Sequence, residues 1–202
     1  MLLIKAKTKI IFDNDWLKKL KFVEHTDEDL VNKCSAIAVK SASGGVFDFY
    51  RGGQDFDPFE APEEYKYTKL YETLPEVKKL VDSFKFKTSR IRIHKQPPGK
   101  TIELHTDSNN WHDTPKEKYL LRSTTALSDS PESVYNFEVK GKLHSYTLKR
   151  GETIIFDPDL VKHGMENSST KNYRYALVQV FQAFPVSDWF KNFINVENEI
   201  IL

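Results

Sequence analysis

Short segments in which polar and apolar residues alternate, separated by turn residues, follow one another from Thr88 to Phe184. The alternation is strict over Arg90-Ile91-Arg92-Ile93-His94, and Pro97-Pro98-Gly99 then ends this segment with a turn. A period of two residues is typical of β-strands, because successive side chains point to opposite faces of a sheet. Many short strands favour a sandwich or barrel, and polar residues on several strands favour a barrel with a working interior. We therefore predict a mainly β fold over 88–184, a double-stranded β-helix (jelly roll, cupin-like) of two four-stranded antiparallel sheets around a cleft, with flanking α-helices packed on its outside.

The remaining strands of this core are expected where the alternation recurs between turns, namely over 101–106, 118–127, 136–139, 143–148, 153–156 and 173–184. Lys140-Gly141-Lys142 lies between two of these strands and predicts a hairpin. Before the core, Thr73-Leu74-Pro75-Glu76 predicts the start of a helix, with an N-cap, an early proline and an acidic first turn. An apolar stripe then follows along this helix, made by Val77, Leu80, Val81 and Phe84.

The rest of the chain is expected to mix helices, strands and one long irregular loop. The expected elements are a helix through Trp16, Leu17 and Leu20, a helix start at Thr26–Asp29, strands over 35–40 and 46–50, a loop over 51–62, and a C-terminal helix over 185–202. The chain then reads as one domain over 1–202, with a mixed part over 1–87 before the jelly-roll core.

Composition indicates a globular protein without a strongly charged partner. The 202 residues are enough for one sizeable core, and the formal net charge of +1 creates no bulk field that would recruit nucleic acid or an anionic membrane. Cys34 is the single cysteine, which excludes an intramolecular disulfide and favours a reducing compartment. The first residues lack the apolar stretch of a secretory signal. We expect a cytoplasmic protein with no nucleic-acid or membrane partner; the sequence does not indicate an oligomeric state.

Three side chains spaced along the core form a candidate metal site. His105 and Asp107 lie two residues apart, so on one strand both face the same way, and His163 follows 56 residues after Asp107, past the Asp157-Pro158-Asp159 turn. Two imidazoles and one carboxylate suit non-haem Fe(II) and leave coordination positions open, although zinc accepts the same ligands. His25, His112 and His144 are interpreted as ordinary surface or core histidines.

Two arginines on expected strands are candidates for binding an anion. Arg174 shares a strand face with Ala176, Val178 and Val180, and Arg122 shares one with Leu120, Thr124 and Ala126. An arginine that points into a narrow barrel needs an anionic partner, because an unpaired buried charge is costly. A dicarboxylate such as 2-oxoglutarate can supply that partner, since a guanidinium binds a carboxylate through two parallel hydrogen bonds.

The stretch from Arg90 to Gln182 resembles the aspartyl/asparaginyl β-hydroxylase-like group of Fe(II)/2-oxoglutarate-dependent oxygenases, which includes hydroxylases of free proline. The resemblance is carried by Pro98-Gly99, Ile102-Glu103-Leu104-His105-Thr106-Asp107, Arg122 with Thr124, Gly151-Glu152 before Phe156-Asp157, His163-Gly164-Met165-Glu166-Asn167, and Arg174. It implies that His105, Asp107 and His163 bind iron. It also implies that Arg174 binds the distal carboxylate of 2-oxoglutarate and Arg122 the proximal one.

The chain departs from the pattern of that group at two places. A histidine is common two residues after the equivalent of Arg122, and Thr124 stands there in this chain; Thr124 and His94 are retained as candidate co-substrate contacts. The insert over 108–119 carries Trp111 and His112 and is a candidate lid.

The resemblance implies an Fe(II)-, 2-oxoglutarate- and O2-dependent dioxygenase. Such an enzyme hydroxylates an unactivated C–H of an amino acid or peptidyl residue of the Asp, Asn or Pro type and produces succinate and CO2. Two alternatives stay open at this point. One is another cupin-type metal enzyme that does not use 2-oxoglutarate, and the other is a non-catalytic jelly-roll module that binds sugars or peptides.

Overall fold

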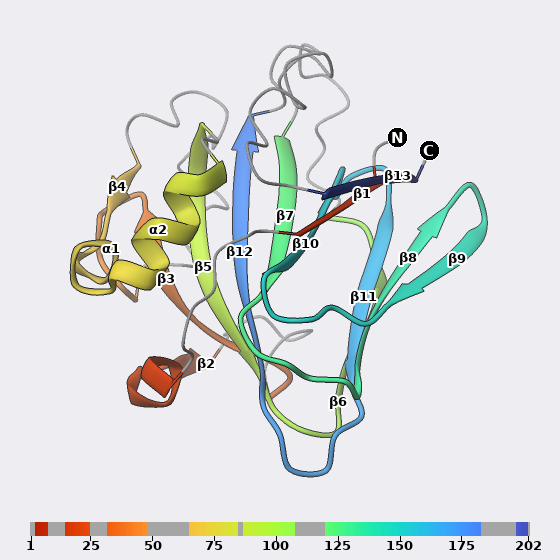
Figure 1. Ribbon diagram of the computed structural model, residues 1–202, viewed down its shortest axis with the longest axis horizontal. Coiled ribbons are helices and arrows are strands. Elements are labelled where there is room, and N and C mark those ends of the chain that lie inside the picture. The colour runs from red at the N-terminus through yellow and green to blue at the C-terminus, as the bar shows by residue number, and fades with distance from the viewer. Residues whose placement is uncertain are drawn as a thin grey trace.

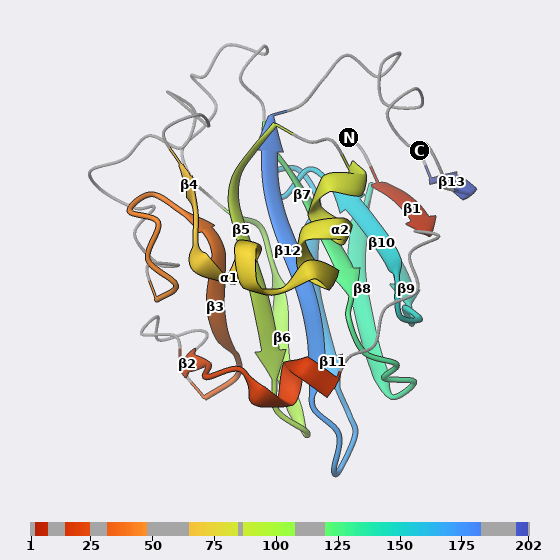
Figure 2. The same ribbon diagram turned by 60° about the vertical axis from the view of Figure 1, so that its left-hand side comes forward.

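Two facing antiparallel sheets form the body of the protein, as the computed structural model shows (Figures 1 and 2). The structure describes residues 3–7, 15–24, 32–47, 65–84, 87–107, 120–182 and 197–201. The arrangement is a mainly β jelly roll, as the alternating segments predict. None of the helices in these described ranges is both long and apolar enough to cross a membrane.

The larger sheet has nine strands and contains most of the core. Its strands are β13 (Glu197–Ile201), β1 (Leu3–Lys7), β10 (Glu152–Phe156), β7 (Leu120–Ala126), β12 (Arg174–Gln182), β5 (Thr88–Gln96), β3 (Ser35–Ser41) and β2 (Val23–Glu24) in that spatial order, with β4 (Lys66–Tyr67) also paired to β3. The central strands β10, β7, β12 and β5 are the four expected for one sheet of a jelly roll. The sheet is wider than predicted, because segments from outside the core add strands at both edges.

The smaller sheet has four strands and lies against one face of the larger one (Figure 1). Its strands are β6 (Lys100–His105), β11 (Lys162–Asn167), β8 (Ser133–Val139) and β9 (Lys142–Tyr146), in that order. The predicted hairpin joins β8 and β9. Lys140 and Gly141 take positive φ angles of 52° and 75° at its turn, a left-handed conformation that glycine adopts without strain.

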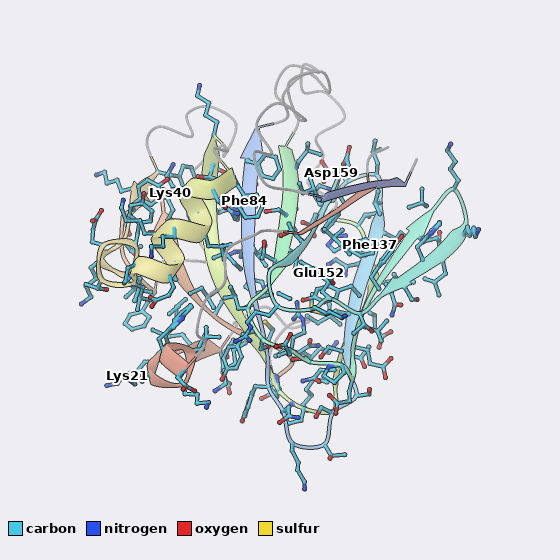
Figure 3. All side chains as sticks on the ribbon, in the orientation of Figure 1. Lys21, Lys40, Phe84, Phe137, Glu152 and Asp159 are labelled. Atoms are coloured by element: carbon cyan, nitrogen blue, oxygen red, sulfur yellow. The ribbon has the colours of Figure 1, made fainter. Side chains whose placement is uncertain are left out.

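Helices cover the other face of the larger sheet (Figure 2). The predicted apolar stripe is confirmed, because Val77, Leu80, Val81 and Phe84 are the buried residues of α2 (Pro75–Phe84). They join one hydrophobic cluster with inward residues of the sheet, including Ile91, Ile93 and Leu177. Figure 3 shows Phe84 on α2 at this layer, whereas Phe137 comes from β8 on the opposite side of the sheet.

The prediction that Thr73 is the N-cap of α2 is wrong. Thr73 ends a separate short helix, α1 (Lys69–Thr73), and its hydroxyl donates to the carbonyl of Lys69 at 2.8 Å. The N-cap that the structure shows is Thr68, whose hydroxyl accepts the backbone N–H of Leu70. The helix α1 ends before Pro75 because proline has no backbone N–H to donate to the preceding turn.

Other expected elements differ from the structure or fall outside it. Residues 15–19 form a 3₁₀ helix, η1 (Asp15–Lys19), in place of a longer helix, and residues 46–47 form a turn where a strand was expected. The predicted C-terminal helix over 185–202 is wrong at its end, where 197–201 pair with β1 as a strand. The helix start at 26–29, the loop over 51–62, the insert over 108–119 and residues 185–196 lie outside the described residues.

Candidate metal centre

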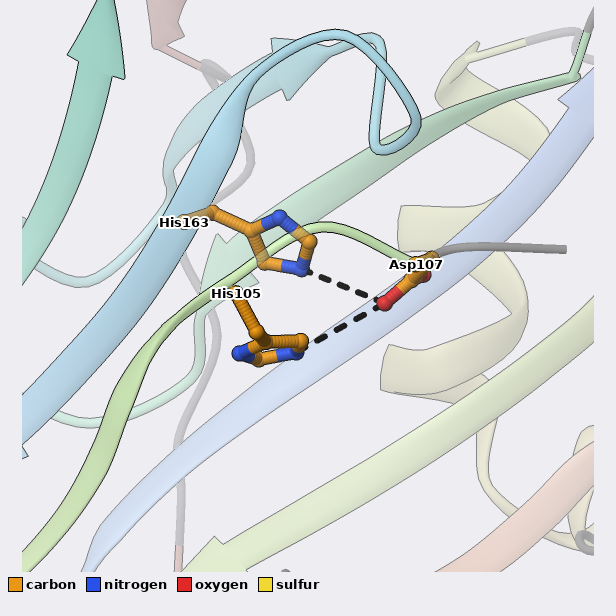
Figure 4. Close-up of side chains that lie close together, drawn as sticks. All are labelled: His105, Asp107 and His163. Atoms are coloured by element: carbon orange, nitrogen blue, oxygen red, sulfur yellow. Dashed lines mark ion pairs between the residues drawn. The ribbon is translucent and has the colours of Figure 1, made fainter.

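The three predicted metal ligands come together at one point between the two sheets (Figure 4). One nitrogen or oxygen atom from each of His105, Asp107 and His163 lies within 4.8 Å of the others. The Asp107 Oδ1 atom is 3.6 Å from Nε2 of His105 and 3.5 Å from Nε2 of His163. Two imidazoles and a carboxylate at this spacing can close around one divalent cation, which suits Fe(II).

Strand pairing explains why residues so far apart in the sequence meet. His105 ends β6 and is the register partner of His163 on the neighbouring strand β11. Asp107 follows β6, and its backbone N–H donates to the carbonyl of Pro158 at 3.0 Å, in the turn that leads to β11. His163 itself lies within β11 and is only 5% exposed.

Gly164 permits the close approach of β6 and β11 beside the site. A Cβ atom at this position would lie 2.7 Å from the carbonyl oxygen of Ile102 and 3.0 Å from backbone atoms of Glu103. The pairing of the two strands also shifts register between His163 and Met165. Glycine is therefore needed at the position where the ladder is irregular and the two histidines are brought side by side.

Backbone carbonyls orient both imidazole rings. Nδ1 of His105 donates to the carbonyl of Glu103 at 2.8 Å, and Nδ1 of His163 donates to the carbonyl of Val161 at 3.1 Å. With Nδ1 protonated in each ring, the lone pair of Nε2 faces the shared centre. This second layer of hydrogen bonds is the arrangement that fixes the tautomer of a metal-binding histidine.

Arg122 stands against the candidate ligands on the larger sheet. Its Nη2 atom contacts Asp107 Oδ2, and its Nη1 atom donates to His163 Nε2 at 3.0 Å. Burial opposes ionisation of Asp107, but Arg122 and the two histidines hold the pKa of this carboxyl well below its usual value. Burial lowers the pKa of His163, so its ring is neutral and can act as a ligand near neutral pH.

A pocket opens beside the centre and reaches inward between the sheets. It contains about 350 Å³ of space not filled by atoms, part of it open to solvent. Its walls are partly polar and partly apolar, and the lining residues are His94, Arg122, Thr124, Tyr135, Phe137, Phe156, His163, Gly164, Met165 and Val178. The predicted co-substrate residues Arg122, Thr124 and His94 therefore lie on the wall of one pocket that also contains a candidate metal ligand.

Arg174 lies next to this pocket but behind Tyr135. Its side chain is 1% exposed, Nε donates to the Tyr135 hydroxyl at 2.7 Å, and Nη1 donates to Oε1 of Gln96 at 3.2 Å. Nη2 is buried and has no hydrogen-bond partner within the described residues. The partners of this buried cation are thus neutral groups, which leaves its charge available for an anion.

The sequence interpretation missed Tyr135. This tyrosine alternates with Phe137 along β8, and both side chains are buried at 3% and 2% exposure. The predicted strand began only at Asn136, one residue too late to include Tyr135. The alternation of two aromatic residues was the available signal, because side chains two apart share one face of a strand.

Comparisons with known proteins identify the family and agree with the fold. The sequence pattern of the aspartyl/asparaginyl beta-hydroxylase family matches residues 46–183, about two thirds of the chain. No protein among the curated sequences matches the chain. A crystal structure of an oxidoreductase of the 2OG-Fe(II) oxygenase family from Burkholderia pseudomallei is similar with a TM-score of 0.51 and 13% identity, over 82% of this chain and 74% of that one.

Two further solved structures are similar over shorter stretches. A prolyl-4-hydroxylase from Pseudomonas putida has a TM-score of 0.38 and 16% identity, over 48% of this chain, and the match spans about half (52%) of that hydroxylase. A predicted oxalate decarboxylase from Thermotoga maritima has a TM-score of 0.34 and 18% identity, over 52% of this chain and 74% of that one. The family match covers both strands that carry the candidate ligands and the strand that carries Arg174. On this match, the chain belongs to the aspartyl/asparaginyl β-hydroxylase family, a family of oxygenases.

Proposed function

We propose that this protein is an Fe(II)- and 2-oxoglutarate-dependent dioxygenase that hydroxylates an unactivated C–H of an amino acid or peptidyl residue. One observation carries the proposal. The cluster of His105, Asp107 and His163 borders a pocket whose wall includes Tyr135, the residue that contacts the buried cation of Arg174. A metal at one end and a positive charge at the other suit a co-substrate that chelates through one end and carries a carboxylate at the other.

The donor set fits the proposed metal. Two imidazole Nε2 atoms and one carboxylate are ligands that Fe(II) accepts in a facial arrangement with open positions. The low pKa of Asp107 and the lowered pKa of His163 keep both groups deprotonated near neutral pH, so the metal does not need to displace their protons. Because Asp107 supplies a carboxylate ligand, no position is reserved for a halide, and hydroxylation is favoured over halogenation.

When bound, Fe(II) with 2-oxoglutarate and O2 supplies the oxidative chemistry, which forms succinate and CO2 as the substrate is hydroxylated. The protein binds and orients the reactants. We assign the proximal carboxylate to Arg122, whose guanidinium borders Asp107 and His163. Thr124 and His94 lie on the same wall and complete its polar side.

The distal carboxylate is assigned to Arg174, with Tyr135 between this residue and the pocket. The apolar walls formed by Phe137, Phe156 and Val178 exclude water from the enclosed co-substrate and strengthen its electrostatic contacts. A cupin-type metal enzyme that does not use 2-oxoglutarate would leave Nη2 of Arg174 without an acceptor. A sugar- or peptide-binding module would not need three metal-binding side chains at one point.

The test of this proposal separates binding from turnover. Purified protein is titrated anaerobically with Fe(II) and then with 2-oxoglutarate by calorimetry, and succinate formation is then followed in air with ascorbate and a panel of amino acids and short peptides. We expect one metal ion per chain and metal-dependent binding of 2-oxoglutarate. Metal binding without any affinity for 2-oxoglutarate would favour the cupin-type alternative, and the absence of both would favour a binding module.

A further inference from the structure

Two more arginines, Arg90 and Arg92, lie on β5. Along this strand, Ile91 and Ile93 are completely buried in the cluster beneath α2, so the alternate residues Arg90 and Arg92 face the other way. Arg92 is the register partner of Val178, which lines the pocket. Both arginines therefore lie on the sheet face that forms the pocket wall.

An irregularity in the pairing of β5 with β12 lies at Arg90. Gln179 of β12 pairs with Ile91, whereas Phe181 pairs with Thr88, so β5 has one extra residue between these pairs. A β-bulge of this kind re-aims a side chain and is common next to active sites. The guanidinium of Arg90 is within electrostatic reach of Tyr65, Arg122 and Asp107, and the last two of these belong to the candidate metal centre.

Arg90 is half-buried, and no carboxylate forms an ion pair with it within the described residues. It makes no hydrogen bond or ion pair within the described part of the chain, and its Nε atom is buried without an acceptor. Burial lowers the pKa of Arg90, and burial with the neighbouring charges of Arg90 and Arg122 lowers that of Arg92 to about 9. A guanidinium in such surroundings has a strong electrostatic demand for an anion.

Neither Asp107 nor the carboxylates of 2-oxoglutarate serve as the counter-ion of Arg90. Asp107 is the carboxylate whose charge acts on Arg90, and it is already bound by Arg122 and assigned to the metal. The two carboxylates of 2-oxoglutarate are assigned to Arg122 and Arg174. The metal adds further positive charge, so Arg90 still lacks a counter-ion when metal and co-substrate are both in place.

We infer that Arg90 is a substrate-binding residue, and that the substrate carries a carboxylate group which Arg90 binds beside the metal centre. The inference rests on the proposed function, because the substrate is what remains to enter the site after 2-oxoglutarate. A guanidinium matches a planar carboxylate through two parallel hydrogen bonds. Arg92 contributes positive potential to the same face and needs no direct contact.

The carboxylate can come from two sources, namely the α-carboxylate of a free amino acid or the side chain of an acidic residue. The probes distinguish them. One arm compares free L-amino acids with their α-carboxamides. The other compares N-acetylated amides of Asp and Glu with those of Asn and Gln, which have the same shape without the charge. The readout is succinate formation above the rate without probe, together with the half-saturating concentration of each active probe.

We expect activity with carboxylate probes of one arm and none with their neutral counterparts. Arg90→Gln should raise the half-saturating concentration of the active probe on the order of 30-fold, because a charge-assisted pair is lost. Arg90→Lys should give an intermediate value, since lysine keeps the charge without the planar fork. Anaerobic affinity for Fe(II) and 2-oxoglutarate should not change in either variant.

Lys95→Gln is the matched control, because Lys95 lies on the same strand and is directed to the opposite face, over the ring of Tyr173. Arg90→Gln should leave the thermal midpoint of the ligand-free protein unchanged or higher, since it removes an unpaired charge; a clearly lower midpoint would mean that Arg90 has a structural role instead. Equal activity of acids and amides, an unchanged half-saturating concentration in Arg90→Gln, or no activity with any probe while 2-oxoglutarate binds would each overturn the inference. A wild-type protein that binds no 2-oxoglutarate would instead overturn the proposed function itself.

Discussion

The guanidinium of Arg174 lies against the ring of Tyr135, with Cζ 4.4 Å from the ring centroid and Nε donating to the hydroxyl at 2.7 Å. Burial raises the pKa of Tyr135, although the charge of Arg174 opposes this, so the hydroxyl keeps its proton. The Tyr135 hydroxyl therefore needs a hydrogen-bond acceptor when the co-substrate occupies the pocket. A carboxylate in the pocket would accept a hydrogen bond from the Tyr135 hydroxyl while Arg174 supplies the positive charge.

Tyr135→Phe should therefore weaken the binding of 2-oxoglutarate and lower stability together. Removal of the hydroxyl leaves Nε of Arg174 buried without an acceptor, which costs about 1–3 kcal/mol in unfolding free energy. Urea unfolding and anaerobic calorimetry measure the two effects. Tyr173→Phe is the control, because Tyr173 is 44% exposed and should show neither effect. Full 2-oxoglutarate affinity in Tyr135→Phe would remove this tyrosine from the site.

Arg174→Lys should weaken 2-oxoglutarate binding while leaving affinity for Fe(II) nearly intact, and Arg174→Ala should weaken it further. Loss of one charge-assisted pair costs on the order of 2–5 kcal/mol, part of it from the carboxylate left unpaired. The measurement is the anaerobic dissociation constant of 2-oxoglutarate in the presence of Fe(II). An unchanged value in Arg174→Ala would mean that the distal carboxylate is held by another cation.

His163→Ala should abolish binding of one Fe(II) per chain, because two ligands remain from a set of three. Since His163 is buried in β11, we also expect a loss of about 1–3 kcal/mol in unfolding free energy from the space left behind. His144→Ala on β9 is the control, because this histidine lies outside the cluster of candidate ligands. Metal content after dialysis and urea unfolding distinguish the two effects. Wild-type iron affinity in His163→Ala contradicts the assignment of the ligand.

Gly164→Ala should impair the metal centre without touching a ligand. The added methyl group would lie 2.7 Å from the Ile102 carbonyl, so β6 and β11 must move apart and carry His105 away from His163. Overpacking of this kind costs about 1–3 kcal/mol in stability. Lys162→Ala, at an exposed position of the same strand, controls for general effects on β11. Iron affinity equal to that of the wild type would show that the strands can absorb the methyl group.

Cys34 predicts a loss of stability at alkaline pH. Burial raises the pKa of this thiol to about 11, so the folded protein keeps the proton at pH values where the unfolded chain releases it. The contribution of the protonated Cys34 thiol to the unfolding free energy is fully present below the ordinary thiol pKa. It falls by about 2–3 kcal/mol in all as the pH rises toward 11. The unfolding free energies of wild type and Cys34→Ala should therefore differ less at pH 10.5 than at pH 8. A constant difference between the two proteins across this range contradicts the prediction.

The sequence by itself determined the class of fold and the identity of the candidate ligands. Strict alternation over residues such as Arg90–His94 reports which side chains face opposite sides of a strand, and the spacing of His105 and Asp107 places both on one face. The stripe of α2 was likewise readable, because helical periodicity follows from burial of one face. These features are local, and the repeat of a strand or a helix appears directly as a period in the sequence.

Only the tertiary structure decided which distant residues meet. The pairing of His163 with His105 depends on strand register and on the space that Gly164 leaves beside Ile102. The position of Arg174 behind Tyr135 depends on two sheets packing face to face, and the extra residue in β5 at Arg90 depends on the pairing between β5 and β12. Strand order brings 197–201 onto β1 where a helix was expected, because an unpaired sheet edge can be completed by a segment from any part of the chain. Such contacts join residues whose separation along the chain carries no information about their distance in space.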